Sequence, residues 1–154
     1  MAINVVLVKP QIPQNTGNIA RTCVVTGSVL HLVGPMGFSL NEKHLKRAGL
    51  DYWPDLTLHT YENLDAFMAL HGEKDLWLFS SKAQKSFADA AFFDDCSLLF
   101  GSETEGLGEE LVLKNRERSV CIPMANGQRC LNLSNAACTA VYEALRQNGY
   151  LGLH

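Results

Sequence analysis

Short runs of apolar residues alternate along the chain with longer segments in which apolar residues recur every three or four positions. Continuous apolar runs are typical of strands buried on both faces of a parallel sheet, and the second spacing is typical of amphipathic helices. Their alternation predicts an α/β fold with a mostly parallel sheet flanked by helices on both faces. The predicted strands are Ile3–Val8, Val29–Val33, Leu56–His59, Leu76–Phe79, Ser97–Phe100 and Ser119–Ile122.

Helix boundaries follow from capping residues and glycines. The first helix is expected to begin at a cap on Asn15 or Thr16 and to end at Gly27. The last helix is expected to begin at Asn132 or Ser134, and its apolar positions repeat with a helical period. Four further helical segments are predicted between these two: Leu40–Leu50, Tyr61–His71, Lys85–Ala91 and Gly108–Lys114.

Three predicted strands end in polar or glycine-rich loops, which are Phe79–Lys82, Gly101–Leu107 and Ile122–Cys130. Loops at the carboxyl ends of neighbouring parallel strands form one pocket, and a following helix N-terminus offers free N–H groups to a nucleotide-like ligand. The chain has no G-x-G-x-x-G after the first strand and no Walker, H-E-x-x-H or G-x-S-x-G motif. The usual dinucleotide fold, P-loop nucleotidases, zinc proteases and serine hydrolases are therefore disfavoured.

Composition and charge restrict the class of protein. The 154 residues are 47% hydrophobic and 19% charged, which predicts one globular domain spanning 1–154 without an appended RNA-binding domain. A net charge of −3 excludes a strongly basic nucleic-acid binder but leaves room for a local basic patch. Lys43, Lys46 and Arg47 form the densest such patch. A solvated helix face and a phosphate-binding surface are equally good interpretations of it.

The expected compartment is the cytoplasm. The chain contains no apolar run of eighteen residues, and its N-terminus enters a strand directly, so neither a membrane span nor a signal peptide is predicted. Five cysteines without a C-x-x-C pair predict neither a disulfide framework nor a structural zinc site, and no metal cofactor is expected. Of the cysteines, only Cys130 lies in a polar loop, where we consider it a binding position.

The first helix carries a polar face at the end of the first strand. Asn18 and Arg21 are three residues apart and share this face. The face is interpreted either as a second ligand-binding surface or as a solvated surface with an ordinary arginine.

Three stretches together resemble the three motifs of the SPOUT RNA methyltransferases. They are N-T-G-N-I-A-R at Asn15–Arg21, F-G-S-E-T-E-G-L at Phe100–Leu107 and I-P-M…R-C-L-N-L-S-N-A at Ile122–Ala137. The length and the segments G-P-M-G-F and K-R-A-G-L-D-Y narrow the resemblance to the TrmL/YibK family. That family methylates the ribose 2′ oxygen of the wobble nucleotide of tRNA, which is cytidine or modified uridine at position 34 of leucine tRNAs.

The resemblance implies a C-terminal deep trefoil knot that holds S-adenosyl-methionine largely through main-chain groups. It also implies a homodimer built on the first and last helices, where Ala136, Ala137, Ala140 and Ala144 would allow close approach. Ordinary tight packing inside the subunit is the alternative interpretation of these alanines. By motif position, the cofactor contacts are expected at Phe79, Gly101, Ile122, Met124, Cys130 and Leu131, with Ser134 nearby.

The resemblance also assigns roles in catalysis and RNA binding. Arg21 is expected to orient the ribose hydroxyl or bind the adjacent phosphate, because its pKa is too high for a base. Asn15, Asn18 and Ser134 would orient the ribose, and Tyr142 is a weaker candidate whose alternative is a buried structural phenol. RNA contacts are expected at Lys43, Lys46, Arg47 and Arg129.

Two positions depart from the pattern of the resemblance. Glu105 stands where some relatives carry arginine, which would weaken a phosphate contact or change the RNA target. Cys130 stands where serine is common, so the contact there is expected through its backbone. Three alternatives remain, namely methylation of another tRNA position, methylation of ribosomal RNA, and a non-catalytic RNA- or nucleotide-binding module.

Overall fold

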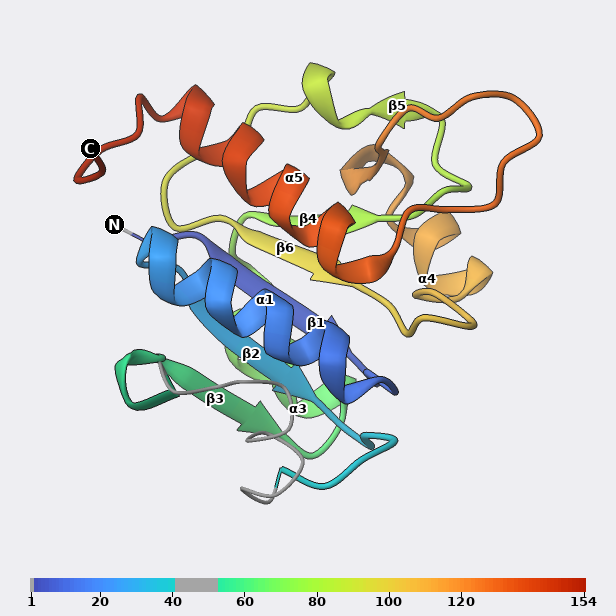
Figure 1. Ribbon diagram of the computed structural model, residues 1–154. Coiled ribbons are helices and arrows are strands. Elements are labelled where there is room, and N and C mark those ends of the chain that lie inside the picture. The colour runs from blue at the N-terminus through green and yellow to red at the C-terminus, as the bar shows by residue number, and fades with distance from the viewer. Residues whose placement is uncertain (1, 41–52) are drawn as a thin grey trace.

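A seven-stranded, fully parallel sheet organises the computed structural model, in which residues 2–40 and 53–154 are described (Figure 1). The strand order is β3-β2-β1-β6-β4-β7-β5, so it reverses between β1 and β6. Predicted bounds are confirmed for three strands and lie within one residue for two. The strands are β1 (Asn4–Val8), β2 (Val29–Val33), β3 (Leu58–Tyr61), β4 (Leu76–Phe79), β5 (Lys85–Ser86), β6 (Ser97–Phe100) and β7 (Ser119–Cys121).

The central strands are buried on both faces, as their continuous apolar runs predict. Successive residues of β1 point into two different cores, with Val5 and Leu7 in one and Val6 and Val8 in the other. Helices α1 (Pro13–Thr26) and α5 (Leu133–Gln147) supply the first core. Phe67 of α3 (Leu64–His71) and Leu111 of α4 (Glu109–Lys114) pack in the second. The α/β prediction with helices on both faces is therefore confirmed.

The edge elements differ from the sequence prediction. β3 lies two residues later than expected, and α3 begins after Asn63, whose side chain accepts a hydrogen bond from the N–H of Ala66 at 2.8 Å. The predicted helix Lys85–Ala91 is wrong, because β5 pairs with β7 and is followed by a 3₁₀ turn at Phe87–Asp89. Nearly all of the predicted helix Leu40–Leu50 lies outside the described residues.

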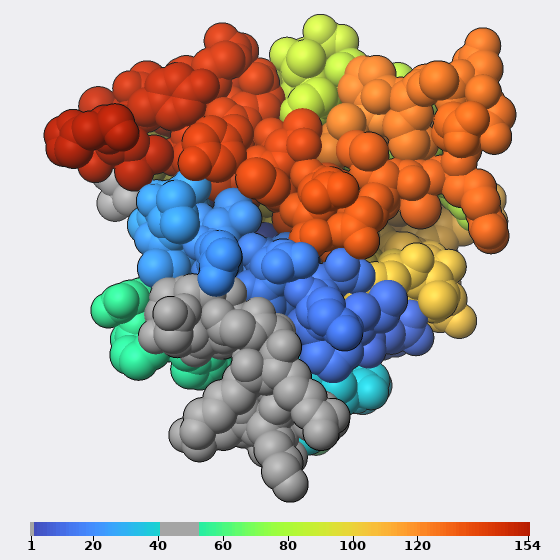
Figure 2. Space-filling view, viewed as in Figure 1, coloured from blue at the N-terminus to red at the C-terminus, as the bar shows by residue number. Residues whose placement is uncertain are grey.

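Helices α1 and α5 pack side by side over the same face of the sheet (Figures 1 and 2). Ala137, Ala140 and Ala144 are fully buried in the core of the subunit itself. Ordinary packing inside the subunit therefore accounts for these three alanines, whereas Ala136 is only partly buried. The dimer contact of the two helices stays a prediction. The exposed positions of the two helices are Gln14, Asn18, Arg21, Val25, Asn135, Thr139, Tyr142 and Arg146.

A buried polar network joins β1, β2, β3 and α3. His31 Nε2 lies 2.8 Å from Asn4 Oδ1, and His31 Nδ1 lies 2.9 Å from the Tyr61 hydroxyl. The same hydroxyl lies 3.0 Å from His71 Nε2. Burial lowers the pKa of His31 to about 4, with further lowering from His59, His71 and Lys74 and a small opposing effect of Asp95.

We expect this network to make stability pH-dependent. The folded pKa of His31 lies below that of the unfolded chain, so its contribution is complete above pH 6.5 and declines as the pH falls towards about 4. His31→Leu should be about 1–3 kcal/mol less stable at neutral pH, because Asn4 and Tyr61 lose their partner. Its urea midpoint should also fall less than the wild-type midpoint between about pH 7.5 and about pH 4.5. His154→Asn, at the exposed C-terminus, should keep the wild-type pH dependence, and equal slopes in all three proteins would contradict the assignment.

Candidate cofactor and RNA site

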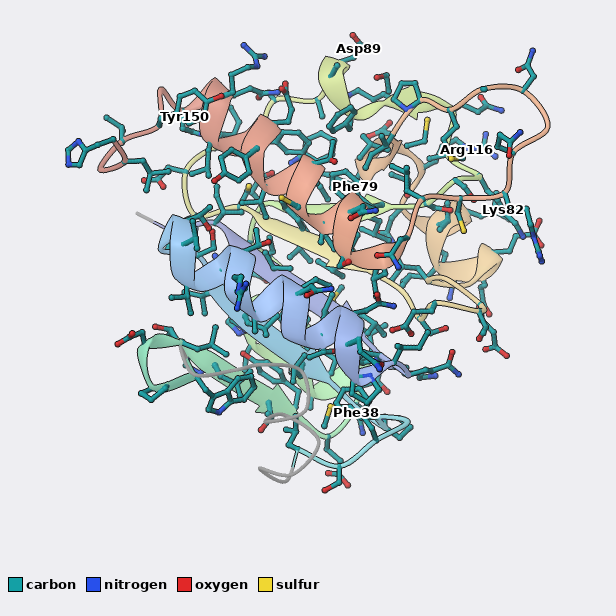
Figure 3. The ribbon with its side chains drawn as sticks, in the orientation of Figure 1. Phe38, Phe79, Lys82, Asp89, Arg116 and Tyr150 are labelled. Atoms are coloured by element: carbon teal, nitrogen blue, oxygen red, sulfur yellow. The ribbon has the colours of Figure 1, made fainter. Side chains whose placement is uncertain are left out.

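The three polar loops leave the same edge of the sheet because β6, β4 and β7 are parallel neighbours. Phe79, at the end of β4, is buried and stacks on Phe100, at the end of β6, with ring centroids 4.8 Å apart. Figure 3 shows Phe79 close to α5 and Lys82 at the outer rim of the same side of the molecule. The three loops therefore share one edge of the sheet, and the pocket expected between them stays a prediction.

Gly101 begins the turn after β6 and touches the returning backbone of that turn. A Cβ atom added at Gly101 would lie 1.9 Å from the carbonyl carbon of Gly106 and 2.1 Å from the nitrogen of Leu107. The turn is closed by a hydrogen bond from the N–H of Gly106 to the carbonyl of Ser102, at 2.9 Å. Only glycine permits this approach, so the sequence position is fixed by backbone packing.

Glu103 ties this turn to the start of α1. Its carboxylate accepts hydrogen bonds from the N–H groups of Gln11 at 2.8 Å and Ile12 at 3.0 Å, and from the Asn15 amide at 3.4 Å. A carboxylate at a helix N-terminus is favoured by the helix dipole and by the free N–H groups there. The prediction that Asn15 or Thr16 caps α1 is wrong, because the helix begins at Pro13 and both residues are buried inside it.

Asn132 continues this hydrogen-bond chain into the third motif. Its Nδ2 donates to Asn15 Oδ1 at 3.1 Å, and its Oδ1 accepts from the N–H of Ser134 at 2.9 Å. The Ser134 hydroxyl donates to the same Oδ1 at 2.5 Å, which leaves the hydroxyl oxygen free to accept. Asn132 is thus the cap of α5, as predicted. Glu103, Asn15, Asn132 and Ser134 link all three motifs in one chain of contacts.

The remaining candidate catalytic residues lie on a neighbouring surface. Asn18 and Arg21 are exposed on α1, and Tyr142 is 42% exposed on α5, so the alternative of a buried structural phenol does not hold. The chain of contacts from Glu103 to Ser134 runs through Asn15 and Asn132. The structure therefore brings Asn15 and Ser134 together and leaves the other three on the exposed face shared by α1 and α5.

The loop between β7 and α5 suits a ligand held by main-chain groups. Between Pro123 and Leu131, the only main-chain N–H that donates to an acceptor in the described part of the chain is that of Gln128. Ile122 and Met124 are half-buried, whereas Arg129, Cys130 and Leu131 are exposed. The donor set of this loop therefore fits a polar nucleoside-type group. The other basic candidates, Lys43, Lys46 and Arg47, lie outside the described residues.

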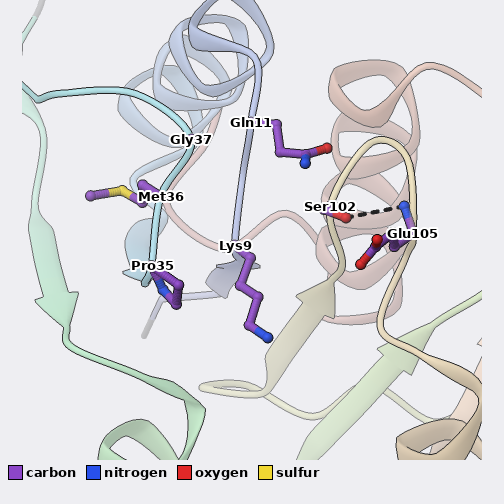
Figure 4. A pocket seen from close by; sticks show the side chains of 7 residues that line it. All are labelled: Lys9, Gln11, Pro35, Met36, Gly37, Ser102 and Glu105. Carbon is purple, nitrogen blue, oxygen red and sulfur yellow. Dashed lines mark hydrogen bonds between the residues drawn. The ribbon is translucent and has the colours of Figure 1, made fainter.

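A cleft beside these loops was missed by sequence reasoning. It occupies about 250 Å³ at the carboxyl ends of β1, β2 and β6 (Figure 4). Five of its seven lining residues lie in the segments G-P-M-G-F and F-G-S-E-T-E-G-L, so the sequence named these residues but gave no sign that they meet. Its lining residues are Lys9, Gln11, Pro35, Met36, Gly37, Ser102 and Glu105.

Comparison with known proteins agrees with this arrangement. The model of the SpoU rRNA methylase family matches residues 2–142, which include all of the motif loops. The chain belongs to the SpoU rRNA methylase family. A relative from Geobacillus stearothermophilus is 46% identical over 99% of both chains. The tRNA (cytidine(34)-2'-O)-methyltransferase of Saccharophagus degradans is 44% identical over 97% of both chains.

The fold of this chain is also similar to that of a solved structure. It is described as giving structural insights into the 2-OH methylation of C/U34 on tRNA, and it superposes on this SpoU-family chain with a TM-score of 0.90. The two chains are 42% identical, and the match covers 96% of this chain and 97% of the other. In residues 2–40 and 53–154, no helix is long and apolar enough to cross a membrane. The same residues contain no group of three or more potential metal-ligating side chains.

Proposed function

We propose that the protein is an S-adenosyl-methionine-dependent methyltransferase that modifies the ribose 2′ oxygen of the wobble nucleotide, position 34, of tRNA. The substrates are cytidine or modified uridine at that position, in leucine tRNAs, and the enzyme acts in the cytoplasm. The observation that carries the proposal is the chain of contacts from Glu103 through Asn15 and Asn132 to Ser134. It holds the three motif loops together at one edge of the sheet.

The cofactor belongs in the loops that follow β4, β6 and β7. Its sulfonium supplies an already activated methyl group, so the protein has to position the acceptor hydroxyl and assist loss of its proton. Phe79 and Gly101 line the inner side of this proposed site, with Ile122, Met124, Cys130 and Leu131 on the outer loop. The main-chain N–H groups between Pro123 and Leu131 are the donors available to hold the ligand. The proposal includes the C-terminal trefoil knot of the family.

Each acceptor-side residue has a distinct role in the proposal. The Ser134 hydroxyl oxygen accepts a hydrogen bond from the ribose hydroxyl, since its own proton is already donated to Asn132. Asn15 is 6% exposed and bonded on both sides, so it positions Asn132 and the turn at Glu103. Arg21 holds the ribose hydroxyl or its neighbouring phosphate, with Asn18 beside it and Tyr142 on the adjacent helix.

The proposal includes a homodimer that buries the exposed face of α1 and α5. Val25 is 63% exposed and Tyr142 is 42% exposed on this face, and large exposed apolar side chains favour a protein contact there. In such a dimer, Arg21 of one subunit would face the cofactor loops of its partner. The basic residues Lys43, Lys46, Arg47 and Arg129 would contact tRNA phosphates.

The activity is tested with labelled S-adenosyl-methionine, total tRNA and separately prepared ribosomal RNA. We expect label on position 34 of leucine tRNAs, and no loss of rate when a chelator is added, because the methyl donor needs no metal activation. The methylated nucleotide is mapped by digestion and mass spectrometry. Label on another tRNA position, or on ribosomal RNA alone, would show that the proposed substrate is wrong. Cofactor binding by calorimetry without transfer to any RNA would support a non-catalytic binding module.

A further inference from the structure

The cleft at the ends of β1, β2 and β6 lies where the strand order of the sheet reverses. Lys9 and Gln11 follow β1, Ser102 and Glu105 follow β6, and Pro35–Gly37 follow β2. In open parallel sheets, the crevice outside such a reversal is the usual place for a ligand. The proposed cofactor loops follow β6, β4 and β7, so this cleft is a separate space on the other side of the turn after β6.

The walls of the cleft are held at a fixed separation. The N–H of Gly37 donates to the carbonyl of Pro10 at 3.0 Å, and a Cβ atom on Gly37 would lie 3.1 Å from Gln11 Cα. The N–H of Lys9 donates to the carbonyl of Val33 at 2.7 Å. These contacts fix the loop after β2 against the segment after β1. The cleft is therefore formed by the backbone and needs no ligand to open it.

The polar groups of the cleft have a defined donor and acceptor pattern. Gln11 Oε1 accepts a hydrogen bond from the Thr104 hydroxyl at 2.7 Å, which leaves the amide NH₂ as a donor. Ser102 Oγ accepts from the N–H of Glu105 at 3.1 Å, which leaves its hydroxyl proton to donate. The Glu105 carboxylate accepts only, and it forms no ion pair within the described part of the chain. Figure 4 shows the Gln11 and Glu105 side chains directed into the space between the two loops.

With the Lys9 ammonium as one more donor, these groups can complement the edge of cytosine. Cytosine presents an exocyclic amine that donates, beside ring nitrogen and carbonyl acceptors, and a carboxylate is the usual partner of that amine. The amide of Gln11 and the hydroxyl of Ser102 supply the two donors, and Pro35 and Met36 supply apolar surface for the face of the ring. Uracil places a carbonyl oxygen where cytosine has its amine. A carboxylate would repel that oxygen.

We propose that this cleft binds the base of the nucleotide being methylated and that the Glu105 carboxylate selects cytidine over uridine. The proposal rests on the proposed function and assigns its base-reading site. The turn after β6 connects the two sites, because Gly101 lies at the cofactor loops, Glu103 holds the start of α1, and Ser102 and Glu105 line the cleft.

The test compares two leucine tRNA transcripts that differ only in cytidine or uridine at position 34. The wild-type protein should prefer cytidine by roughly tenfold in kcat/KM. Glu105→Gln should bring the two values close together, because a glutamine amide can face either base. Glu109→Gln removes the same charge from an exposed position at the start of α4 and should keep the wild-type preference.

A binding measurement separates failure of this proposal from failure of the proposed function. Cytidine 5′-monophosphate should shift the backbone NMR signals of Gln11, Ser102 and Glu105 more strongly than uridine 5′-monophosphate does, and Glu105→Gln should remove the difference. This readout needs no methyl transfer. A Glu105→Gln variant that keeps the wild-type preference in transfer would overturn the proposal. So would cytidine 5′-monophosphate that leaves these three signals unmoved.

Discussion

Replacing Gly101 with alanine should destabilise the protein by about 3 kcal/mol and abolish binding of S-adenosyl-methionine. The added methyl group would collide with the backbone of Gly106 and Leu107, at 1.9 and 2.1 Å. Backbone atoms cannot move aside as a flexible side chain does, so the turn after β6 would have to open. That turn carries Glu103, so opening it would also release the start of α1 and the contact with Asn15.

Gly127→Ala is the matched control for this collision. Gly127 lies in the loop before α5 with a φ of +81° and has no atom within 4 Å of an added Cβ. Its alanine variant should cost only about 1 kcal/mol, from left-handed backbone strain. Urea denaturation gives the free energy of unfolding of both variants, and calorimetry gives their cofactor affinity. If Gly101→Ala unfolds at the wild-type midpoint, the close approach at this turn does not constrain the protein.

The central part of the fold is predictable from sequence because burial on both faces leaves an unmistakable pattern. Val5–Val8 of β1 is apolar throughout, and its alternate residues enter two cores. The edge strands are different. β5 is two residues long and exists through its pairing with β7, a contact between segments more than thirty residues apart that local propensity does not encode.

The start of α1 shows a second limit of local rules. Asn15 and Thr16 have the chemistry of helix caps, and only distant residues reveal why they are not caps. Glu103 supplies the acceptor from another loop, and Pro13 occupies the first turn. Asn15 is then free to bridge Glu103 and Asn132. Asn15, which was predicted to orient the ribose, also holds two other loops of the protein together.

The loops of the candidate site were predictable from the sequence, whereas the contacts between these loops were not. Asn15, Gly101 and Ser134 were candidates because they lie in the motifs. The structure adds the hydrogen bonds that hold Asn15 and Ser134 and the close backbone contact that requires glycine at position 101. The cleft beside them could not be predicted, because Lys9, Gln11 and Met36 become neighbours of Glu105 only through the strand order. Glu105, which departs from the family pattern, thereby has a proposed role in recognising the base.

Arg21→Ala should reduce methyl transfer to tRNA by roughly a hundredfold to a thousandfold, with little change in cofactor affinity. Arg21 is exposed on α1, and the chain of contacts through Asn15 and Asn132 is made by other side chains, so that chain should survive the substitution. Arg21→Lys keeps the charge but loses the planar guanidinium with its paired donors. Its rate of methyl transfer should lie between those of the wild type and Arg21→Ala. Single-turnover rates measure the loss, and calorimetry measures cofactor binding. Loss of cofactor binding in a folded Arg21→Ala protein would show that the arginine acts on the cofactor side.

A mixing experiment decides which subunit Arg21 serves. Leu131→Pro is the second inactive variant, because Leu131 is exposed, its N–H donates to no acceptor in the described part of the chain, and proline removes that donor. Circular dichroism should show that it folds, and calorimetry should show that it no longer binds cofactor.

If Arg21 acts on the partner's cofactor site, subunits of Arg21→Ala and Leu131→Pro complement each other after exchange. Random pairing makes about half of the dimers mixed, and each mixed dimer then holds one complete site, so about a quarter of the wild-type rate should return. If Arg21 serves its own subunit, each site in the mixed dimer lacks one component, and the mixture stays as inactive as its parts. Size-exclusion chromatography establishes that exchange has occurred, with Val25→Asp, at the exposed face of α1, as the variant expected to elute as a monomer. Inactive mixed dimers would therefore reject the composite site while leaving the role of Arg21 intact, because the single-variant rates measure that role independently.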